Sequence, residues 1–357
     1  MSLPATRHVA ALTGDGRITL LEQPVPALRE GAVLVQVHAS LVSPGTELGG
    51  WRQLAAQRDA CSAGARSTLP APKPFGYSNA GVVVAAGSSK SEFAPGDRVA
   101  CIGAGYALHT DVAVVPHHLC VRLPDPVSFA QGAYAMLAAT AMHALRRGQP
   151  EFGESCAVVG LGLVGQLSAS LYQLAGNEVI GWDSIPFRCE VARRRGIRVT
   201  ATVGAEDEVA ATEAFTRGAG LDAAVLAFGG DATKAVDTLE RCFKRTPDGH
   251  RWGRLVVVGG CTFQYPSRTT NLDVRRASRT GYGYHYEAWE YGAPYPPVAM
   301  RWTTRTNLEL CMRLIAERRL EVDALTTHTI SLAAVETGVA AILDEPDRIL
   351  GVVLTSA

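Results

Sequence analysis

Three glycines in one short stretch have the spacing of a dinucleotide-binding turn. Gly160, Gly162 and Gly165 follow a short apolar run that suits a buried parallel strand. The first glycine permits a tight turn, the second lets a pyrophosphate approach the backbone, and the third lets a helix pack on the strand. The phosphates would then meet the N-terminal end of a helix that begins at Leu163 and Val164.

An acidic residue ends the next predicted strand, at a distance that suits the same site. Val179, Ile180 and Trp182 form this strand, and Asp183 closes it about 20 residues after the glycines. A carboxylate there can accept hydrogen bonds from an adenosine ribose and would repel a 2′-phosphate, so we expect NAD(H) to be preferred over NADP(H). Arg188 is evidence for the opposite preference, because an arginine can neutralise that phosphate.

Composition and charge exclude several other classes of protein. The 357 residues favour two domains, and contents of 47% apolar and 19% charged residues suit a globular protein with a sizeable core. A net charge of zero without a long basic run argues against nucleic-acid binding. Neither a signal peptide nor an apolar run of membrane-spanning length is visible. The scattered cysteines form no C-x-x-C pair, so we expect a reducing, cytoplasmic location.

The chain divides by its pattern into a β-rich part and an alternating part. Residues 1–125 contain short β-branched runs separated by Gly and Pro turns, and a helix is expected over 128–147. Strand and helix patterns alternate over 154–260, which predicts a parallel sheet covered on both faces. A long helix is expected over 304–319, and the strand 350–355 is expected to return to the first domain.

Several short motifs carry a resemblance to a known superfamily. They are Ser43-Pro-Gly-Thr-Glu47, Phe75-Gly-Tyr-Ser-Asn-Ala-Gly-Val-Val83, Gly96-Asp-Arg-Val99, Met136-Leu-Ala-Ala-Thr-Ala-Met-His143 and Leu161-Gly-Leu-Val-Gly165. With them the chain resembles the medium-chain dehydrogenase/reductase superfamily over essentially its full length. The segments 300–307 and 325–328 are similar to a branch that includes bacteriochlorophyllide dehydrogenase and sugar- or cyclitol-associated oxidoreductases.

The resemblance implies an α/β fold of two domains. A GroES-like, β-rich catalytic domain would comprise residues 1–125 and be completed by about 296–357. A Rossmann domain with a doubly wound parallel sheet would comprise residues 126–295 and bind NAD or, alternatively, NADP. The active site would lie in a cleft between the two domains, and the protein would be a homodimer.

The chain departs from the zinc-dependent members of this superfamily at the ligand positions. Pro44 stands where those members have a cysteine, and Tyr77 and Ser78 stand where they have a His-Glu pair. No Cys, His or acid occurs over 136–138, where the third ligand is expected. Because catalytic zinc requires about three N, S or O donors, we expect no zinc and no other metal.

Without a metal, a side chain must interact with the reacting oxygen while hydride moves. Tyr77 is the first candidate, although its ring can equally be a filler of the vacated metal cavity. Thr46 can relay a proton as the resemblance implies, whereas Glu47 can either act in catalysis or anchor its loop through an ion pair. His109 is a candidate general acid or a structural histidine, and Thr140 is expected to touch the nicotinamide.

A tyrosine-rich stretch follows the alternating region. We expect Tyr284, His285 and Tyr286 to line a substrate pocket, where aromatic faces can stack on a ring. The alternative is that this stretch forms a dimer surface. Taken together, these patterns predict a zinc-independent NAD(H)-dependent oxidoreductase that interconverts a secondary alcohol and a ketone on a sugar-like, cyclitol or secondary-metabolite substrate. A zinc-free alkene reductase of the quinone type and a non-catalytic cofactor sensor are the alternatives.

Overall fold

The chain folds into two compact units that each contain a β-sheet. The computed structural model describes residues 4–14, 16–47, 49, 71–265, 270–295, 301–343 and 345–356. Unit 1 comprises residues 1–136, 282–318 and 325–357, and unit 2 comprises residues 137–281 and 319–324.

Unit 1 is built mainly from antiparallel strands. They are β1 (Thr6–Leu12), β2 (Ile18–Pro24), β3 (Ala32–Val42), β4 (Lys73–Pro74), β5 (Ser78–Ala86), β6 (Arg98–Ile102), β7 (Val112–Pro116), β8 (Cys120–Arg122), β18 (Thr326–Ser331) and β19 (Gly351–Thr355). The larger sheet has the order β18-β19-β3-β5-β6-β8, with β7 also paired to β3, and a smaller sheet has the order β2-β1-β4. The strand β3 is buried along most of its length.

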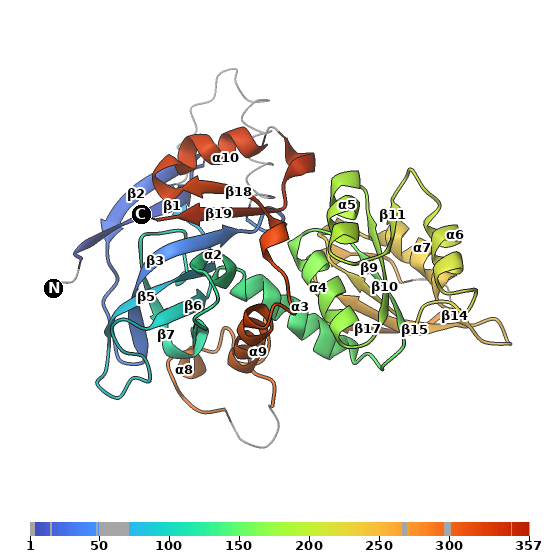
Figure 1. The fold of residues 1–357 in the computed structure, drawn as a ribbon, viewed down its shortest axis with the longest axis horizontal. Coiled ribbons are helices and arrows are strands. Elements are labelled where there is room, and N and C mark those ends of the chain that lie inside the picture. Colours follow the sequence, from blue (N-terminus) through green and yellow to red (C-terminus); the bar gives the residue numbers. More distant parts are fainter. Residues whose placement is uncertain are drawn as a thin grey trace. The chain divides into compact units, whose positions relative to one another are not determined.

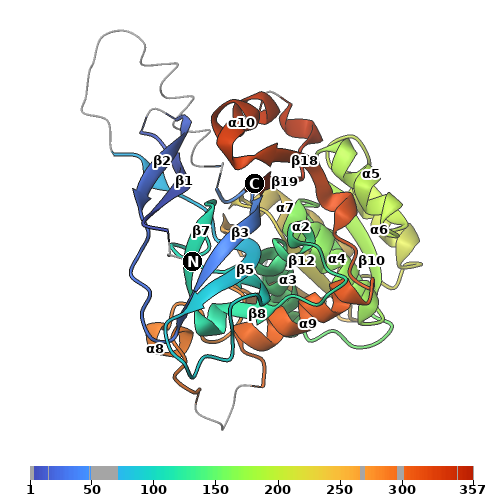
Figure 2. The same ribbon diagram turned by 60° about the vertical axis from the view of Figure 1, so that its left-hand side comes forward.

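The two ends of the chain share one sheet in unit 1. The strand β19 pairs antiparallel with β3, with Val352 opposite Val42 and Thr355 opposite Ala39. The helix α10 (Val335–Leu343) lies beside β18 and β2, as Figures 1 and 2 show. The other helical segments of the unit are η1 (His117–Leu119), α2 (Phe129–Gly132), α8 (Glu287–Glu290), α9 (Thr304–Ala316), η3 (Leu332–Ala334) and η4 (Pro346–Arg348), and η2 (Asp323–Leu325) lies at the boundary with unit 2.

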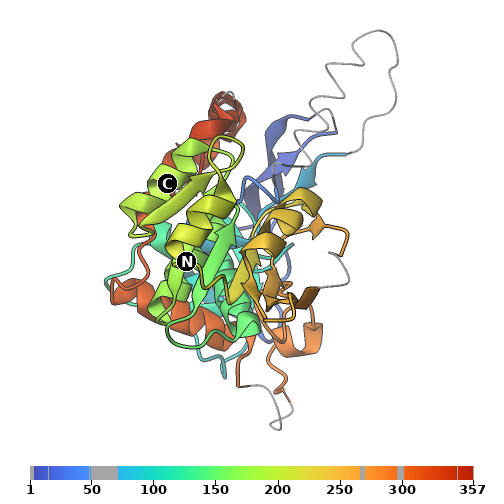
Figure 3. The same ribbon diagram turned by 90° about the vertical axis from the view of Figure 1, so that its right-hand side faces the viewer.

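Unit 2 is a parallel sheet with helices on both faces (Figure 3). Its strands are β9 (Ser155–Val159), β10 (Glu178–Asp183), β11 (Val199–Thr202), β12 (Ala223–Leu226), β13 (Gly230–Asp231), β14 (Lys244–Arg245), β15 (Arg251–Val257), β16 (Cys261–Thr262) and β17 (Thr270–Arg276). The sheet order is β11-β10-β9-β12-β15-β14, with β17 also paired to β15, and β14 is antiparallel. Together with unit 1, this sheet confirms the predicted α/β fold class.

Two apolar clusters hold the helices of unit 2 against the sheet. The helices are α3 (Ala135–Gly148), α4 (Leu163–Leu174), α5 (Pro186–Arg194), α6 (Glu208–Phe215) and α7 (Thr233–Cys242). Side chains of α3, α4 and α5 form one cluster with one face of the strands, whereas those of α6 and α7 form the other cluster with the opposite face. Burial on both faces explains why the strands read as short, continuous apolar runs.

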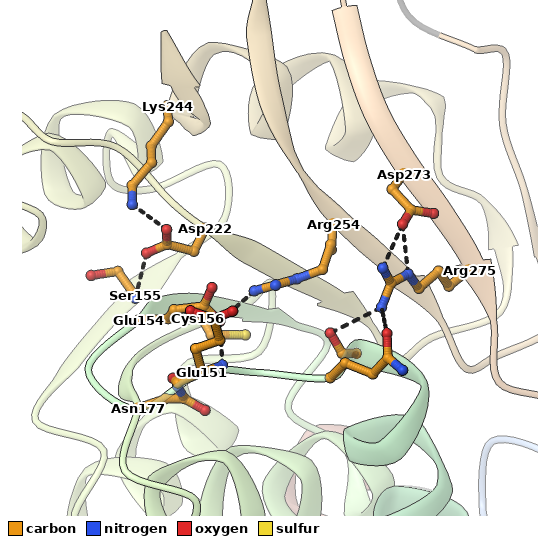
Figure 4. A network of polar contacts seen from close by, with 12 residues as sticks. Glu151, Glu154, Ser155, Cys156, Asn177, Asp222, Lys244, Arg254, Asp273 and Arg275 are labelled. Atoms are coloured by element: carbon orange, nitrogen blue, oxygen red, sulfur yellow. Dashed lines mark hydrogen bonds and ion pairs between the residues drawn. The ribbon is translucent and has the colours of Figure 1, made fainter. Parts of the chain in front are cut away.

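A polar network ties together several strand ends of unit 2 (Figure 4). Asp222 accepts a hydrogen bond from the backbone N–H of Ser155 at 2.9 Å and pairs with Lys244. Glu154 pairs with Arg254 from β15. Since these groups are anchored to different strands, the network fixes the start of β9, the strand that leads into the glycine turn.

Two segments differ from the sequence-based expectation. The helix expected over 128–147 is divided into α2 and α3, because Ser78 Oγ donates to the carbonyl of Ala133 at 2.6 Å and accepts from the N–H of Met136 at 3.2 Å. Residues 282–295 group with unit 1 rather than with the sheet of unit 2. Aromatic packing explains this grouping, since the Trp289 ring lies 4.8 Å from the ring of His118.

Candidate active site

The glycine turn joins β9 to α4, as the sequence spacing predicts. Gly160 has φ +89°, a conformation that side chains disfavour, and a Cβ at Gly165 would lie 1.8 Å from the carbonyl oxygen of Gly160. A Cβ at Gly162, in contrast, would have no heavy atom within 4 Å. The first and third glycines are therefore required by the turn itself, while the second leaves open space beside the N-terminus of α4. Leu163 and Val164 begin that helix.

Asp183 connects the end of β10 to the glycine turn. Its Oδ2 accepts the backbone N–H of Leu161 at 2.6 Å, and its Oδ1 accepts that of Ile185 at 2.8 Å. Its side chain is buried, and Arg188 Nη1 lies 3.6 Å from Oδ2. Asp183, which suits a ribose, and Arg188, which suits a 2′-phosphate, therefore form an ion pair. The two residues that favour different cofactors thus lie next to each other.

Thr140 lies in the middle of α3 and is half-buried. The residues that would bind the cofactor come from several elements of unit 2, namely α3, the turn after β9 with the start of α4, the end of β10 and, for Arg188, α5.

The four candidate catalytic residues of unit 1 share one polar cluster, which we call the Tyr77 cluster. It consists of Ser40, Ser43, Thr46, Glu47, Tyr77 and His109. His109 is fully buried, its Nδ1 lies 2.9 Å from Ser40 Oγ, and its Nε2 lies 3.3 Å and 3.4 Å from the two carboxylate oxygens of Glu47. Glu47 Oε2 also accepts the N–H of Ser43 at 2.7 Å. The sequence did not indicate the two serines.

Tyr77 reaches this cluster from the turn before β5. Its hydroxyl hydrogen-bonds with the side chains of Ser43 and Thr46, and Glu47 and Tyr284 lie close enough to act on it electrostatically. Burial, followed by the negative charge of Glu47, raises the pKa of Tyr77 well above its usual value. The phenol is therefore neutral, and able to donate a hydrogen bond, over the whole physiological range.

Gly76 determines where Tyr77 lies. It has φ +119°, and a Cβ there would lie 2.4 Å from the backbone nitrogen of His109. The carbonyl of Tyr77 accepts the N–H of Gly103 at 2.9 Å. Since only glycine fits at position 76, the backbone on both sides of the Tyr77 ring is held firmly.

The three aromatic candidates after residue 281 have different environments. Tyr284 is 5% exposed, its ring lies 4.0 Å from that of His285, and its hydroxyl accepts the N–H of Ala104 at 3.0 Å. Tyr286 is 54% exposed, and His285 is exposed with φ +67°. Tyr284 therefore belongs to the surroundings of Tyr77, whereas the other two face outwards.

Ser78 and two cysteines of unit 1 make contacts within the fold. Ser78 is buried and bonded to the chain between α2 and α3, as described above. Cys101 and Cys120 lie opposite each other on β6 and β8, with 3.6 Å between their sulfur atoms. Within the described ranges, no three His, Cys, Asp or Glu side chains come close enough together to hold a metal ion. In the same ranges, no helix is long and apolar enough to span a membrane.

Comparisons with known proteins agree with the two-unit architecture. The family model of the alcohol dehydrogenase GroES-like domain matches residues 29–125, which lie in unit 1. Mouse sorbitol dehydrogenase is 24% identical over 366 residues, which cover 93% of this chain and 92% of that protein. The uncharacterised zinc-type alcohol dehydrogenase-like protein YdjJ of Escherichia coli K12 is 25% identical over 60% of this chain and 67% of its own length.

The solved structures add evidence on the fold. An alcohol dehydrogenase from Escherichia coli CFT073, complexed with NADH, superimposes with a TM-score of 0.71 at 16% identity and covers 99% of this chain and 100% of that one. At such low identity the likeness shows the fold. The first curated relatives are matched over about two thirds of their length, from 64 to 67%. From its GroES-like domain, its parallel-sheet unit and these relatives, the chain belongs to the medium-chain dehydrogenase/reductase superfamily, whose members are oxidoreductases.

Proposed function

We propose that the protein is an NAD(H)-dependent oxidoreductase that interconverts a secondary alcohol and a ketone without zinc. The observation that carries this proposal is the Tyr77 cluster, in which a neutral, half-buried phenol stands at the position where the resemblance implies a metal ligand in zinc-dependent members. A phenol can supply by hydrogen bonding what a metal supplies by polarising the reacting oxygen. Thr46, Glu47 and His109 surround or support it.

The residues of unit 2 fit a nicotinamide dinucleotide. The open space beside Gly162 and the N–H groups at the start of α4, which receives no side-chain cap from Gly162, suit a pyrophosphate. Asp183 is an acceptor for ribose hydroxyls, and an ionised carboxylate can accept more hydrogen bonds than the two that it receives from the backbone. When bound, the nicotinamide donates or accepts the hydride, while the protein binds and orients the reactants.

Tyr77 would donate a hydrogen bond to the oxygen of the reacting carbonyl. Its neutral state supports this role, because a phenol that stays protonated is a donor at every working pH. Hydride transfer to a ketone leaves an oxygen that needs a proton, which Tyr77 would pass to it from its hydrogen-bond partner Thr46. Thr46 is exposed, so its hydroxyl can take up that proton from water, and the same relay in reverse would carry away the proton of an alcohol as it is oxidised. His109 is fully buried, and Glu47 is 9% exposed.

The substrate we propose is a sugar-like, cyclitol or other polyhydroxylated secondary alcohol. Similarity to a sorbitol dehydrogenase supports this class. The exposed ring of Tyr286 and the exposed imidazole of His285 offer an aromatic face and polar atoms to such a molecule. The proposal further includes a homodimer in a reducing, cytoplasmic compartment, in keeping with the free cysteines among the described residues.

The test compares Tyr77→Phe with Tyr291→Phe, a matched loss of a phenolic hydroxyl in the same unit. We expect Tyr77→Phe to lower kcat with a panel of polyols and ketoses roughly ten- to a thousand-fold, while NADH binds normally. Tyr291→Phe should keep kcat. Elemental analysis of the same preparations should find no stoichiometric zinc.

Four results would contradict the proposal. One zinc per chain, removed by a chelator together with activity, would show a metal enzyme. Full kcat in Tyr77→Phe would reduce this residue to packing and leave His109 or Glu47 as the better candidate. Activity on enones alone would indicate the alkene reductase, and no hydride exchange with any substrate would indicate a cofactor sensor.

A further inference from the structure

Gln166 is a fully buried amide beside the glycine turn. It lies in the first turn of α4, and its exposed fraction is 0%. Its Nε2 donates to two carbonyls, that of Leu161 in the glycine turn at 3.1 Å and that of Arg188 in α5 at 2.9 Å. Its Oε1 accepts from Arg195 Nη1 at 3.2 Å. Because an arginine can only donate and a carbonyl can only accept, no other orientation of this amide satisfies all three groups.

We propose that Gln166 is a positioning residue for the dinucleotide: its amide holds the carbonyl of Leu161 and thereby keeps the N–H of Gly162 directed at the pyrophosphate. This inference rests on the proposed function, because it concerns the cofactor site that the function requires. It goes beyond helix packing, since an apolar side chain of the same length would pack α4 equally well.

The peptide between Leu161 and Gly162 transmits this contact. Because a peptide bond is planar and trans, its C=O and its N–H point in opposite directions. The carbonyl of Leu161 is directed at the buried amide, so the N–H of Gly162 is directed away from it. No group in the described part of the chain accepts that N–H, and a Cβ at Gly162 would meet no heavy atom within 4 Å. The donor is therefore available to an anion beside the start of α4.

The other hydrogen bonds of the turn hold the peptides on either side of this one. On one side, the N–H of Leu161 donates to Asp183 Oδ2 at 2.6 Å. On the other side, the carbonyl of Gly162 accepts the backbone N–H of Gln166 at 2.8 Å. Within the described ranges, the peptide between Leu161 and Gly162 receives its hydrogen bond from the Gln166 side chain alone. Loss of that amide should therefore release this peptide while the ends of the turn stay held.

Arg195 and α5 hold the amide in place from its other side. Arg195 Nη1 also donates to the backbone carbonyl of Gln166 at 3.2 Å, and its Nη2 donates to the carbonyl of Glu321 at 2.6 Å. The carbonyl of Arg188 belongs to α5, which is held by buried side chains of its own. Since α5 does not depend on Gln166, loss of the amide should leave Arg188 beside Asp183. The discrimination between NADH and NADPH should then persist.

The test is isothermal titration of NADH and of NADPH into the full chain. Gln166→Met keeps a side chain of similar length and removes both the donor and the acceptor. We expect the Kd values for NADH and NADPH to rise by the same factor, about tenfold or more, because both cofactors carry the pyrophosphate. Gln173→Met is the matched control, since Gln173 lies at a later turn of α4 and its Nε2 donates to the carbonyl of Gly196 at 2.9 Å. That variant should leave both Kd values unchanged.

Two further measurements separate the orientation of the turn from damage to the fold. Gln166→Asn keeps a neutral amide that is one methylene too short to reach both carbonyls, so it should cause a loss in the same direction and provides the test if Gln166→Met does not fold. Adenosine, which has the ribose but no phosphate, should bind the wild type and Gln166→Met alike in saturation-transfer NMR. An unchanged Kd for NADH in a folded variant, an equal loss for adenosine or for Gln173→Met, or a change confined to one of the two cofactors would overturn the proposal.

The outcome can be distinguished from that of the proposed function, because the titrations require neither turnover nor Tyr77. If no alcohol or ketone reacts but Gln166→Met weakens the binding of both cofactors, the role of Gln166 stands and the proposed activity fails. If Tyr77→Phe lowers kcat as expected but Gln166→Met binds both cofactors as the wild type does, the proposed activity stands and Gln166 only packs.

Discussion

Replacing Asp183 with asparagine should change the cofactor preference of the protein. The carboxylate carries out two tasks at once: it accepts the N–H groups of Leu161 and Ile185, and it faces the guanidinium of Arg188 at 3.6 Å. Asparagine retains one oxygen acceptor and places an NH₂ group where the second oxygen was. The substitution therefore removes the negative charge and one acceptor, while the size of the side chain is nearly unchanged.

The magnitude follows from the hydrogen bonds involved. A hydrogen bond to a charged group contributes about 1.5–3 kcal/mol, so losing one to the ribose should weaken NADH binding about ten- to a hundred-fold. NADPH should bind more tightly than before, because the carboxylate no longer repels its 2′-phosphate and Arg188 is released to pair with it. The ratio of the Kd for NADPH to that for NADH should thus fall at least about tenfold.

Isothermal titration of both cofactors into the wild type and the variant measures this ratio. Because one backbone N–H also loses its acceptor, thermal unfolding must show that Asp183→Asn is folded at the titration temperature. Asp207→Asn is the control, since Asp207 caps α6 in the same unit through the N–H groups of Val209 and Ala210. Our assignment of Asp183 would be refuted by a wild type that prefers NADPH, or by an unchanged ratio in a folded Asp183→Asn variant.

Two further predictions concern the glycine turn and acid stability. Gly162→Ala should fold normally and weaken NADH binding at least about tenfold. Gly165→Ala should instead lower the melting temperature, because its Cβ would lie 1.8 Å from the carbonyl oxygen of Gly160, whereas a Cβ at Gly162 would meet no atom within 4 Å. Equal effects of the two variants on binding and on melting temperature would contradict this prediction. His143 has a pKa lowered to about 4, by burial and then by the charges of Arg147 and Arg146, so its protonation favours the unfolded chain. Its contribution to the free energy of unfolding is therefore complete above about pH 6.5 and is lost as the pH falls toward 4. We expect His143→Gln to reduce the difference between the free energies of unfolding that urea titrations give at about pH 7.5 and at about pH 5.

The nucleotide-binding turn was predictable because every step that forms it is local. The strand, the glycine spacing and the helix occupy one continuous stretch, and Gly160 and Gly165 are required by contacts within that same stretch. The hydrogen bond between Leu161 and Asp183 spans only 22 residues. Periodicity and spacing describe such a unit well, and the fold class that they predicted is confirmed.

The Tyr77 cluster could be predicted only in part, because its contacts are long-range. The sequence indicated Tyr77, Thr46, Glu47 and His109 as separate candidates, and Tyr77, Glu47 and His109 each had a structural alternative. His109 meets Ser40 across 69 residues and Glu47 across 62 residues. The sheet brings these distant residues together, because β3 pairs with both β5 and β7. No local sequence pattern determines the register of those pairings.

The aromatic segment at residues 284–286 shows that residue type alone does not predict whether a side chain is buried at the site or exposed on the surface. Tyr284 and Tyr286 are two positions apart, yet one is 5% exposed and the other 54% exposed. The backbone between them causes the difference, because Gly283 has φ +96° and His285 has φ +67°, so the chain follows neither a strand nor a helix there. A Cβ at Gly283 would lie 2.4 Å from the ring of Trp289, which holds the turn in place. Tyr284 contacts Ala104 and lies close to Tyr77, whereas Tyr286 stays exposed. We therefore expect Tyr284→Phe to disturb the hydrogen-bond donor Tyr77. Tyr286→Phe should affect only the binding of a molecule at the surface.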